Sequence, residues 1–145
     1  MAFRGEHEHS LDSKDRLTVP RKFRDDLADG YVLAKGPDAC LWLYATKDFD
    51  AMEQRYVAPH SPFGADARDL RRMLNTSADD GELDAAGRIR IPEKLKQAAG
   101  LEGACAVVGA GEYEEIWSVE AWEKKNAELQ SKYFEVAESL AGGEE

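Results

Sequence analysis

The sequence predicts an α+β fold, mainly β, made of two similar halves. Three observations lead to this prediction. A segment at residues 11–24 returns 72 residues later, so that Leu11 matches Leu83. Each copy contains a short run in which polar and aliphatic residues alternate, which is typical of a strand with one buried face. Each copy is followed by a strand-turn-strand pattern and then by an amphipathic helix.

The repeat is long enough to be a complete supersecondary unit that is present twice. The two copies read LDSKDRLTVPRKFR and LDAAGRIRIPEKLK, and with one inserted residue the match extends to residues 43–49 and 116–122. A half of roughly 50 residues buries too little surface to be stable alone. We therefore expect the two halves to share one core.

The first elements of each half are predicted to be strands and turns. Residues 3–10 alternate loosely and are expected to form a strand, with turn residues following at 12–15. Residues 16–19 and 88–91 alternate strictly, so their aliphatic side chains are expected in the core. The residues expected on the outward face are Arg16, Thr18, Arg88 and Arg90.

Two positions of the repeat constrain the backbone. Gly87 occupies the place of Asp15, which predicts a positive φ at both. Pro20 and Pro92 end the strands and are expected to open helices at residues 21–28 and 93–99.

The rest of each half is predicted to be a hairpin followed by a helix. The expected strands cover residues 31–35, 41–45, 104–108 and 114–119. The expected helices cover residues 49–57, 65–77 and 120–140, with a linker at 58–64 and a frayed tail at 141–145. The side chains expected to face inward on the two middle helices are Phe49, Met52, Tyr56, Leu70, Met73 and Leu74.

The chain divides into four predicted segments. They are a first domain at 5–47, connecting helices and a linker at 48–76, a second domain at 77–120, and a C-terminal helix with its tail at 121–145. The last helix carries Trp122, Leu129 and Val136 near a 3.5-residue spacing, which suits packing either on its own core or on a neighbouring subunit.

The formal net charge is −10, but the charge is unevenly distributed. Residues 112–145 hold ten acidic residues against three lysines, whereas residues 14–24 hold five basic residues against one acidic residue, and 88–96 hold four against one. The two basic segments occupy the same place in the repeat and are expected at similar positions in space. The acidic total therefore does not exclude a nucleic acid partner.

Several other classes of protein are excluded by what the sequence lacks. The N-terminal residues have no apolar signal-peptide core, and no stretch reaches the roughly 20 apolar residues that span a bilayer, so we expect a cytoplasmic protein without membrane contact. Cys40 and Cys105 have no CxxC spacing, which favours buried free thiols. His7 and His9 would share one strand face without a third ligand, so we expect neither a metal nor another cofactor. No catalytic or phosphate-loop motif is present, so we expect no enzyme.

The candidate site combines an aspartate and an arginine four residues apart with neighbouring basic side chains. In a single copy, such a pair would more simply be an ion pair that closes a turn. Its repetition beside Lys14, Arg90 and basic helix positions favours a surface that contacts phosphates. By contrast, Arg68, Arg71 and Arg72 are interpreted as a solvated helix face.

Three stretches of the sequence, RGEHEHSLDSKDRLTVPRKFR, GELDAAGRIRIP and EYEEIWSVEAWE, resemble the MraZ family of transcriptional regulators. The resemblance covers nearly the whole chain and includes two DXXXR motifs. It implies two tandem SpoVT/AbrB-like swapped-hairpin β-barrel halves that form an intramolecular pseudo-dimer, with helices after each half and a long C-terminal helix. It also implies a nucleoid-associated homo-oligomeric ring, an octamer or dodecamer. Such a ring binds double-stranded DNA at short direct repeats in the promoter of the bacterial division and cell-wall gene cluster.

In that family the DXXXR segments are taken to contact DNA, and they fall here on Asp12, Arg16, Asp84 and Arg88. With the basic and polar neighbours added, the expected DNA-binding residues are Asp12, Lys14, Arg16, Thr18, Lys22, Arg24, Asp84, Arg88, Arg90 and Lys94.

Two residues depart from the family's motif. Asp15 stands where glycine is common, and its carboxylate is expected to weaken phosphate contact by Arg16, leaving Arg88 as the stronger contact. Ala86 and its neighbour Ala85 replace a more usual polar pair and leave the second turn with fewer hydrogen-bonding groups. An alternative function is a protein-binding module on the same fold, such as an antitoxin-like partner binder, with the acidic C-terminal helix as its docking surface.

Overall fold

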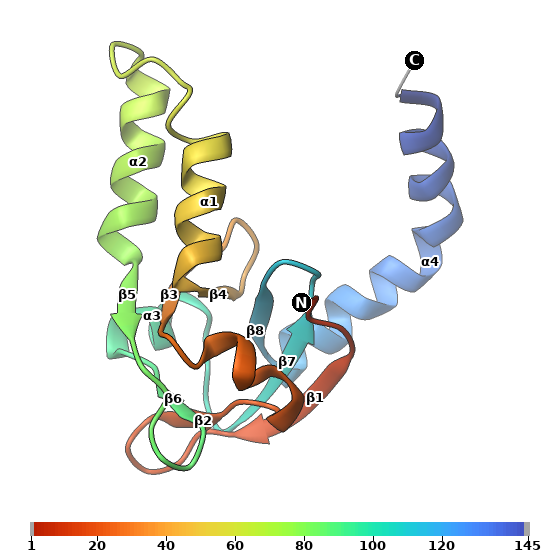
Figure 1. The fold of residues 1–145 in the computed structure, drawn as a ribbon. Coiled ribbons are helices and arrows are strands. Elements are labelled where there is room, and N and C mark those ends of the chain that lie inside the picture. Colours follow the sequence, from red (N-terminus) through yellow and green to blue (C-terminus); the bar gives the residue numbers. More distant parts are fainter. Residues whose placement is uncertain (1, 144–145) are drawn as a thin grey trace.

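The computed structural model describes residues 2–143 and has an α+β fold with antiparallel strands and four helices within that range (Figure 1). The strands are β1 (Glu6–Ser10), β2 (Arg16–Thr18), β3 (Tyr31–Lys35), β4 (Leu41–Ala45), β5 (Asp79–Gly81), β6 (Arg88–Arg90), β7 (Ala104–Gly109) and β8 (Glu114–Ser118). The helices are α1 (Thr46–Tyr56), α2 (Ala65–Ser77), α3 (Glu93–Ala98) and α4 (Val119–Gly143).

The strands of the two halves are interleaved. The larger sheet has the order β1-β7-β8-β4-β3-β5, and β2 pairs with β6 in a separate two-stranded sheet. The first strand of each half therefore lies beside a hairpin strand of the other half, since β1 pairs with β7 and β5 pairs with β3. Neither half has a complete sheet of its own.

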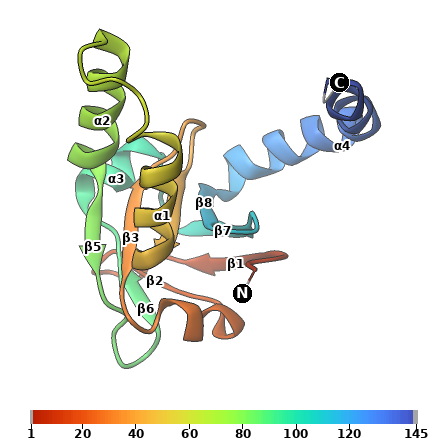
Figure 2. The same cartoon turned by 45° about the horizontal axis from the view of Figure 1, so that its top comes forward.

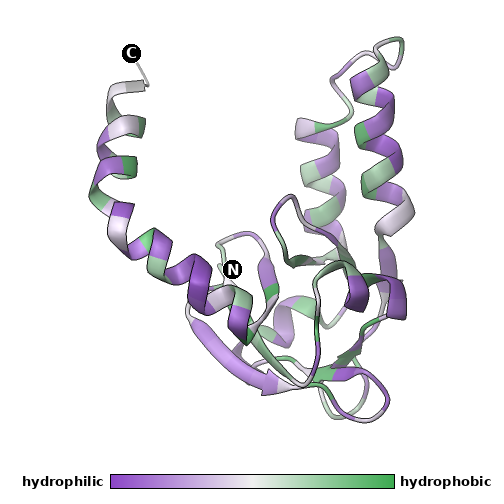
Figure 3. Ribbon diagram, turned by 180° about the vertical axis from the view of Figure 1, so that it is seen from behind, coloured by the Kyte–Doolittle hydropathy of each residue, from purple (hydrophilic) through white to green (hydrophobic). Residues whose placement is uncertain are grey.

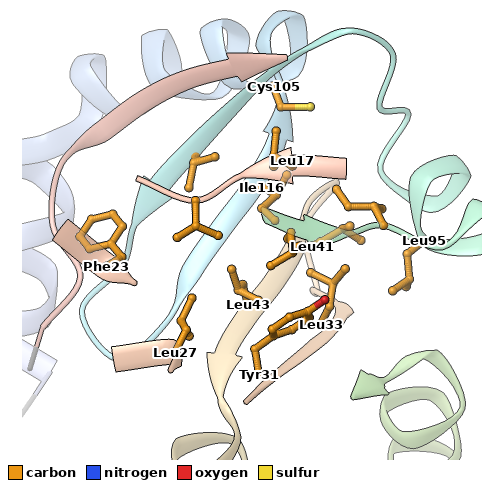
Figure 4. Close-up of a cluster of buried hydrophobic side chains, with 14 of the residues drawn as sticks. Leu17, Phe23, Leu27, Tyr31, Leu33, Leu41, Leu43, Leu95, Cys105 and Ile116 are labelled. Atoms are coloured by element: carbon orange, nitrogen blue, oxygen red, sulfur yellow. The ribbon is translucent and has the colours of Figure 1, made fainter. Parts of the chain in front are cut away.

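One buried cluster is filled by side chains from both halves, which confirms the prediction of a shared core (Figure 4). Leu17 on β2 lies opposite Ile89 on β6, and both are almost fully buried. Phe23 and Leu95, which occupy the same place in the repeat, enter this cluster from the two halves. Burial of a Leu, Ile or Phe side chain stabilises a fold by roughly 1.5–3 kcal/mol. The side chains that the two halves contribute to this cluster are therefore a main source of stability.

Most predicted elements are confirmed, but the expected helix at residues 21–28 is wrong. The segment forms two 3₁₀ turns, Arg21–Phe23 and Asp25–Leu27. Phe23 and Leu27 are still buried as predicted, but Arg24, between the two turns, donates from Nε to the carbonyl of Val19. The adjacent aspartates at 25 and 26 are poor helix formers because their side chains compete for backbone hydrogen bonds.

Other boundaries differ at the ends of elements. The first strand begins at Glu6 and not at residue 3, because Gly5 has a φ of 91° that interrupts the extended backbone. The first long helix begins at Thr46, three residues earlier than predicted. The last helix continues to Gly143, so residues 141–143 of the expected frayed tail are helical, while 144–145 lie outside the described residues.

Two helical arms project from the same side of the sheet body, one made of α1 and α2 and the other of α4 (Figures 1 and 2). The side chains of Phe49 and Leu74 pack in the second buried cluster, as predicted. Tyr56, Leu70 and Met73 were also expected to face inward, but they are 56%, 43% and 64% exposed. The described chain therefore covers these three side chains only in part.

The linker between α1 and α2 is held by the arginines that were interpreted as a solvated face. Arg68 donates to the carbonyls of Pro62 and Phe63, and Arg71 donates to carbonyls at the C-terminal end of α1, including that of Ala58 at 3.2 Å. Arg68 and Arg72 are exposed, as interpreted, and Arg72 pairs with Asp69, whereas Arg71 is partly buried.

Both cysteines are free and buried, as predicted, and burial raises the pKa of the Cys105 thiol to about 11. Among the described residues, no three His, Cys, Asp or Glu side chains gather where they could bind a metal ion. None of the helices combines the length and the apolar character needed to cross a membrane.

One buried group stands out in the main core. Glu114 on β8 is fully buried and lies between Leu43 of β4 and Gly109 of β7. Neither carboxylate oxygen has a hydrogen-bond partner within residues 2–143. Burial, reinforced by the negative charge of Asp26, raises the pKa of Glu114 to about 8, so the folded protein holds this side chain protonated at neutral pH.

We predict that Glu114 makes stability fall as pH rises. Its folded pKa of about 8 lies above the ordinary value of 4.5, so its contribution is fully present below pH 4.5 and is lost as pH approaches 8. Because glutamine does not titrate, Glu114→Gln should gain stability relative to wild type across this window, by about 4–5 kcal/mol in total. Denaturant unfolding at several pH values measures this difference. Glu115→Gln is the matched control, and parallel pH profiles for wild type and Glu114→Gln would contradict the prediction.

Candidate nucleic-acid interface

Each DXXXR segment forms a turn in which one aspartate oxygen accepts two backbone N–H groups. Oδ1 of Asp12 accepts from the amides of Lys14 and Arg16 at 2.8 and 2.9 Å. Oδ1 of Asp84 accepts from the amides of Ala86 and Arg88, both at 2.9 Å. Aspartate is suited to this arrangement because its short side chain reaches backbone amides two residues ahead.

The residue before each arginine has the predicted left-handed conformation. φ is 58° at Asp15 and 75° at Gly87. Both turns are closed by the same backbone bonds, from residue 15 to Asp12 and from residue 87 to Asp84. The two turns are therefore structural copies, although their side chains differ.

The second oxygen of each aspartate binds the arginine of its own motif. Arg16 Nε lies 2.7 Å from Asp12 Oδ2, and Arg88 Nε lies 2.8 Å from Asp84 Oδ2. The backbone amide of Arg16 is the main cause that lowers the pKa of Asp12 to about 2, and the amide of Arg88 lowers that of Asp84 in the same way. Both carboxylates stay ionised at neutral pH and orient the guanidinium groups.

The pairing of β2 with β6 brings the two turns onto one surface. Arg16 lies opposite Arg90, and Thr18 lies opposite Arg88, while Leu17 and Ile89 between them face the core. The predicted outward face is thus confirmed. Arg88 Nη1 also lies 3.5 Å from Oδ2 of Asp12, so one ion-pair network connects the two motifs.

A basic residue from each half packs on the turn of the other half. Lys96 Nζ lies 3.0 Å from Oδ1 of Asp15, and Arg24 covers Gly87 so closely that a Cβ at position 87 would collide with it. The Asp15 carboxylate, which was expected to crowd Arg16, pairs with Lys96. Arg88, expected to be the freer arginine, is the one that contacts two aspartates.

The structure places most of the predicted DNA-binding residues around this face, with two exceptions. Lys22 lies over the ring of Phe23, with Nζ 5.1 Å from the ring centroid. Lys94 donates to the carbonyl of Thr76 at the end of α2. The residues that gather at the two turns and on β2 and β6 are Asp12, Lys14, Arg16, Thr18, Arg24, Asp84, Arg88 and Arg90.

Sequence reasoning counted Lys96 among the basic residues near the motif but left it out of the expected DNA-binding residues. Its contact with Asp15 had one available signal, since Lys96 and Arg24 occupy the same place in the repeat. The structure also reveals a recess of about 360 Å³ at the first turn, lined by Lys14, Asp15, Arg16 and Arg90.

Comparison with known proteins assigns the family. The model of the family described as "MraZ protein, putative antitoxin-like" matches twice, at residues 2–73 and 74–142. The Transcriptional regulator MraZ of Heliobacterium modesticaldum is 40% identical, over 95% of this chain and 96% of that protein. Those of Alkaliphilus oremlandii and Limosilactobacillus reuteri are 37% and 40% identical, over 96% and 94% of this chain and 96% and 95% of their own lengths. With two family domains and relatives matched over nearly their full lengths, this chain belongs to the MraZ family of transcriptional regulators.

Proposed function

We propose that the protein is a sequence-specific DNA-binding transcriptional regulator with no enzymatic activity. It binds short direct repeats in the promoter of the bacterial division and cell-wall gene cluster, and it acts in the cytoplasm at the nucleoid. The observation that carries this proposal is the pairing of β2 with β6, which gathers Arg16, Arg88 and Arg90 on one outward face.

The geometry of the arginines suits recognition of DNA. Each aspartate binds the Nε atom of its arginine, and no hydrogen-bond acceptor within residues 2–143 engages the terminal Nη atoms of Arg16. A guanidinium fixed in this way can present its remaining N–H groups to a phosphate or to the O6 and N7 atoms of guanine. Because the side chain is already oriented, less conformational entropy is lost on binding.

The exchange of strands between the halves supports a further part of the proposal, that each half is a swapped-hairpin β-barrel of the SpoVT/AbrB kind and that the two form an intramolecular pseudo-dimer. On this basis the functional segments are residues 5–47, 48–76, 77–120 and 121–145. A pseudo-dimer presents two equivalent turns to one stretch of DNA, as two separate subunits of a dimeric regulator would.

A ring-shaped homo-oligomer, an octamer or dodecamer, completes the proposal. Within residues 2–143, the exposed large apolar side chains on the two arms are Tyr56, Phe63, Leu70 and Met73 on the first arm and Leu129, Tyr133, Phe134, Val136 and Leu140 on α4. Figure 3 shows hydrophobic positions along both arms. Apolar surface of this extent is normally covered by a partner. The two arms are different surfaces of one chain, so a contact between α4 and the α1–α2 arm of the next chain is head-to-tail. Such contacts form a ring when the rotation from chain to chain closes.

α4 projects away from β2 and β6, so it does not oppose DNA on that face (Figure 1).

A second candidate function is a protein-binding module, in which α4 docks on a different protein. The exposure of Tyr133 and Phe134, at 65% and 83%, favours this alternative. A pulldown that retains a partner protein, together with a failure to bind DNA at moderate salt, would support it over the proposal made here.

We predict that alanine at Arg16 or Arg88 weakens DNA binding without disturbing the fold. Each change should cost about 1–3 kcal/mol of binding if the arginine reads a base edge. The larger loss is expected at Arg16, because Arg88 is partly neutralised by two aspartates. Asp12→Ala and Asp84→Ala should cost less, since they act by orienting the arginines.

Anisotropy titration of a promoter duplex, beside melting curves, measures these effects. Lys124→Ala on α4 is the control for loss of one exposed positive charge. Normal DNA binding by a folded Arg16→Ala/Arg88→Ala double variant would overturn the site assignment.

We also predict strong dependence on salt and on the number of DNA repeats. Each neutralised phosphate contributes a slope of about −0.9 to the plot of log affinity against log salt. A ring presents the β2·β6 face several times, so adjacent repeats should raise affinity through effective concentration. Titration of duplexes with one, two and three repeats at two salt levels tests both points, and equal affinity for all three would count against a ring.

The C-terminal helix is predicted to be needed for assembly. Deletion of residues from Asn126 onward removes exposed apolar surface but leaves Trp122 packed in its cluster, so the shortened chain should fold and form smaller particles. Light scattering gives the mass, and Tyr133→Glu/Phe134→Glu is a full-length variant expected to act similarly. A full-sized particle from both would show that α4 has no role in assembly.

A further inference from the structure

The outward face of the β2–β6 pair has two ends, a first end at the Asp12–Arg16 turn and a second end at the Asp84–Arg88 turn. These ends differ in charge although their backbones match. Position 14 is lysine where position 86 is alanine, and position 90 is arginine where position 18 is threonine. The arginines of the two motifs are common to both ends. The first end therefore has Lys14, Arg16 and Arg90, and the second has Ala86, Arg88 and Thr18.

At the first end, two positive side chains oppose each other. Arg16 and Arg90 are direct cross-strand neighbours, an arrangement that is destabilising for like charges. Arg90 is exposed and has no carboxylate within ion-pair distance among residues 2–143, and the same holds for Lys14. Of the two nearby carboxylates, Asp12 pairs with Arg16 at 2.7 Å and with Arg88 at 3.5 Å, and Asp15 is bound to Lys96.

These three basic side chains line the recess of about 360 Å³ described above, with Asp15 as the other lining residue. An anion in the recess would relieve the repulsion between Arg16 and Arg90. A phosphate group suits it, since arginine binds phosphate oxygens through two parallel N–H groups.

At the second end, the guanidinium of Arg88 is satisfied by two carboxylates of the protein. Arg88 contacts Asp84 at 2.8 Å and Asp12 at 3.5 Å, and its cross-strand neighbour is the uncharged Thr18. Arg24 lies over Gly87, where its Nε donates to the carbonyl of Val19. The cations at the second end are thus Arg88 and Arg24, against Lys14, Arg16 and Arg90 at the first end.

We propose that the recess between Arg16 and Arg90 is a subsite for one phosphate of the DNA backbone and that it fixes the orientation of the chain on DNA. This inference rests on the proposed DNA-binding function. The pseudo-symmetric backbone alone would allow two opposite orientations on one repeat, and the unequal charge selects one of them.

The phosphate subsite is tested without DNA. Inorganic phosphate should raise the melting temperature of the wild type, and Arg90→Thr, which introduces the residue of the equivalent position 18, should remove most of this shift. Lys124→Thr is the control for loss of one positive charge. An equal phosphate shift in wild type and Arg90→Thr would overturn the subsite, whatever the outcome of DNA binding.

Orientation is tested by exchanging the two residues. Arg90→Thr should weaken binding of a single-repeat duplex several-fold and lower its salt slope by about 1. The double variant Arg90→Thr/Thr18→Arg keeps the net charge but moves the additional positive charge from the first end to the second. It should therefore bind the same duplex in the reversed orientation.

The direction is read with a DNA-cleaving reagent attached to an introduced cysteine. Ser13→Cys and Ala85→Cys place it at equivalent exposed positions of the two turns, and the native Cys40 and Cys105 are buried and protected from labelling. With Arg90 and Thr18 unchanged, a reagent attached through Ser13→Cys should cleave one flank of the repeat and a reagent attached through Ala85→Cys should cleave the other. In the Arg90→Thr/Thr18→Arg variant, each reagent should cleave the opposite flank. Unchanged flanks in the exchange variant would show that the recess does not set orientation, and absence of any DNA binding by wild type would instead reject the proposed function itself.

Discussion

The pairing of β2 with β6 is the contact on which the rest of this structure depends. Its inner face places Leu17 against Ile89 at the centre of the shared core, and its outer face carries the arginines. Backbone bonds from Val19 to Gly87 and from Ile91 to Asp15 then tie each strand end to the turn of the other half. Stability and the candidate interface thus share one element, so a change that shifts its register by one residue would exchange buried and exposed side chains.

The aspartates give this surface its rigidity. Asp12 and Asp84 each divide their two oxygens between the backbone of a turn and the arginine of the motif. A flexible arginine loses rotamer freedom when it binds, at a cost of up to about 2 kcal/mol. Here much of that freedom is already removed in the free protein. The DXXXR spacing is therefore a device for positioning a guanidinium, and under the proposed function the ion pair prepares that group for contact with DNA.

Much of the fold could be predicted from the sequence because the repeat shows which positions are equivalent. Strict alternation was enough to place Arg16 and Arg90 outward, and the match of Asp15 with Gly87 was enough to predict a positive φ. Exchange of the strands was not predictable from pattern alone, since an alternating segment does not specify its neighbour. Helical periodicity likewise identifies the apolar face of a helix but not the element that packs against it, which is why Tyr56 was predicted to be buried and is exposed. Burial of Glu114 contradicts the usual preference of a carboxylate for water, and the adjacent Glu115 gave no means of deciding which one faces the core.

The exchange of strands also has a consequence for how the two halves can change over generations. In a dimer of identical chains, any substitution appears on both sides of the symmetry axis at once. Here the two sides are encoded separately, yet the halves stay together because β1 pairs with β7 of the second half and β5 pairs with β3 of the first. Lys14 can therefore coexist with Ala86, and Asp15 bound to Lys96 can coexist with Gly87 beneath Arg24. Because the two halves are parts of one chain, single substitutions can make the two ends of a nearly symmetric backbone different from each other.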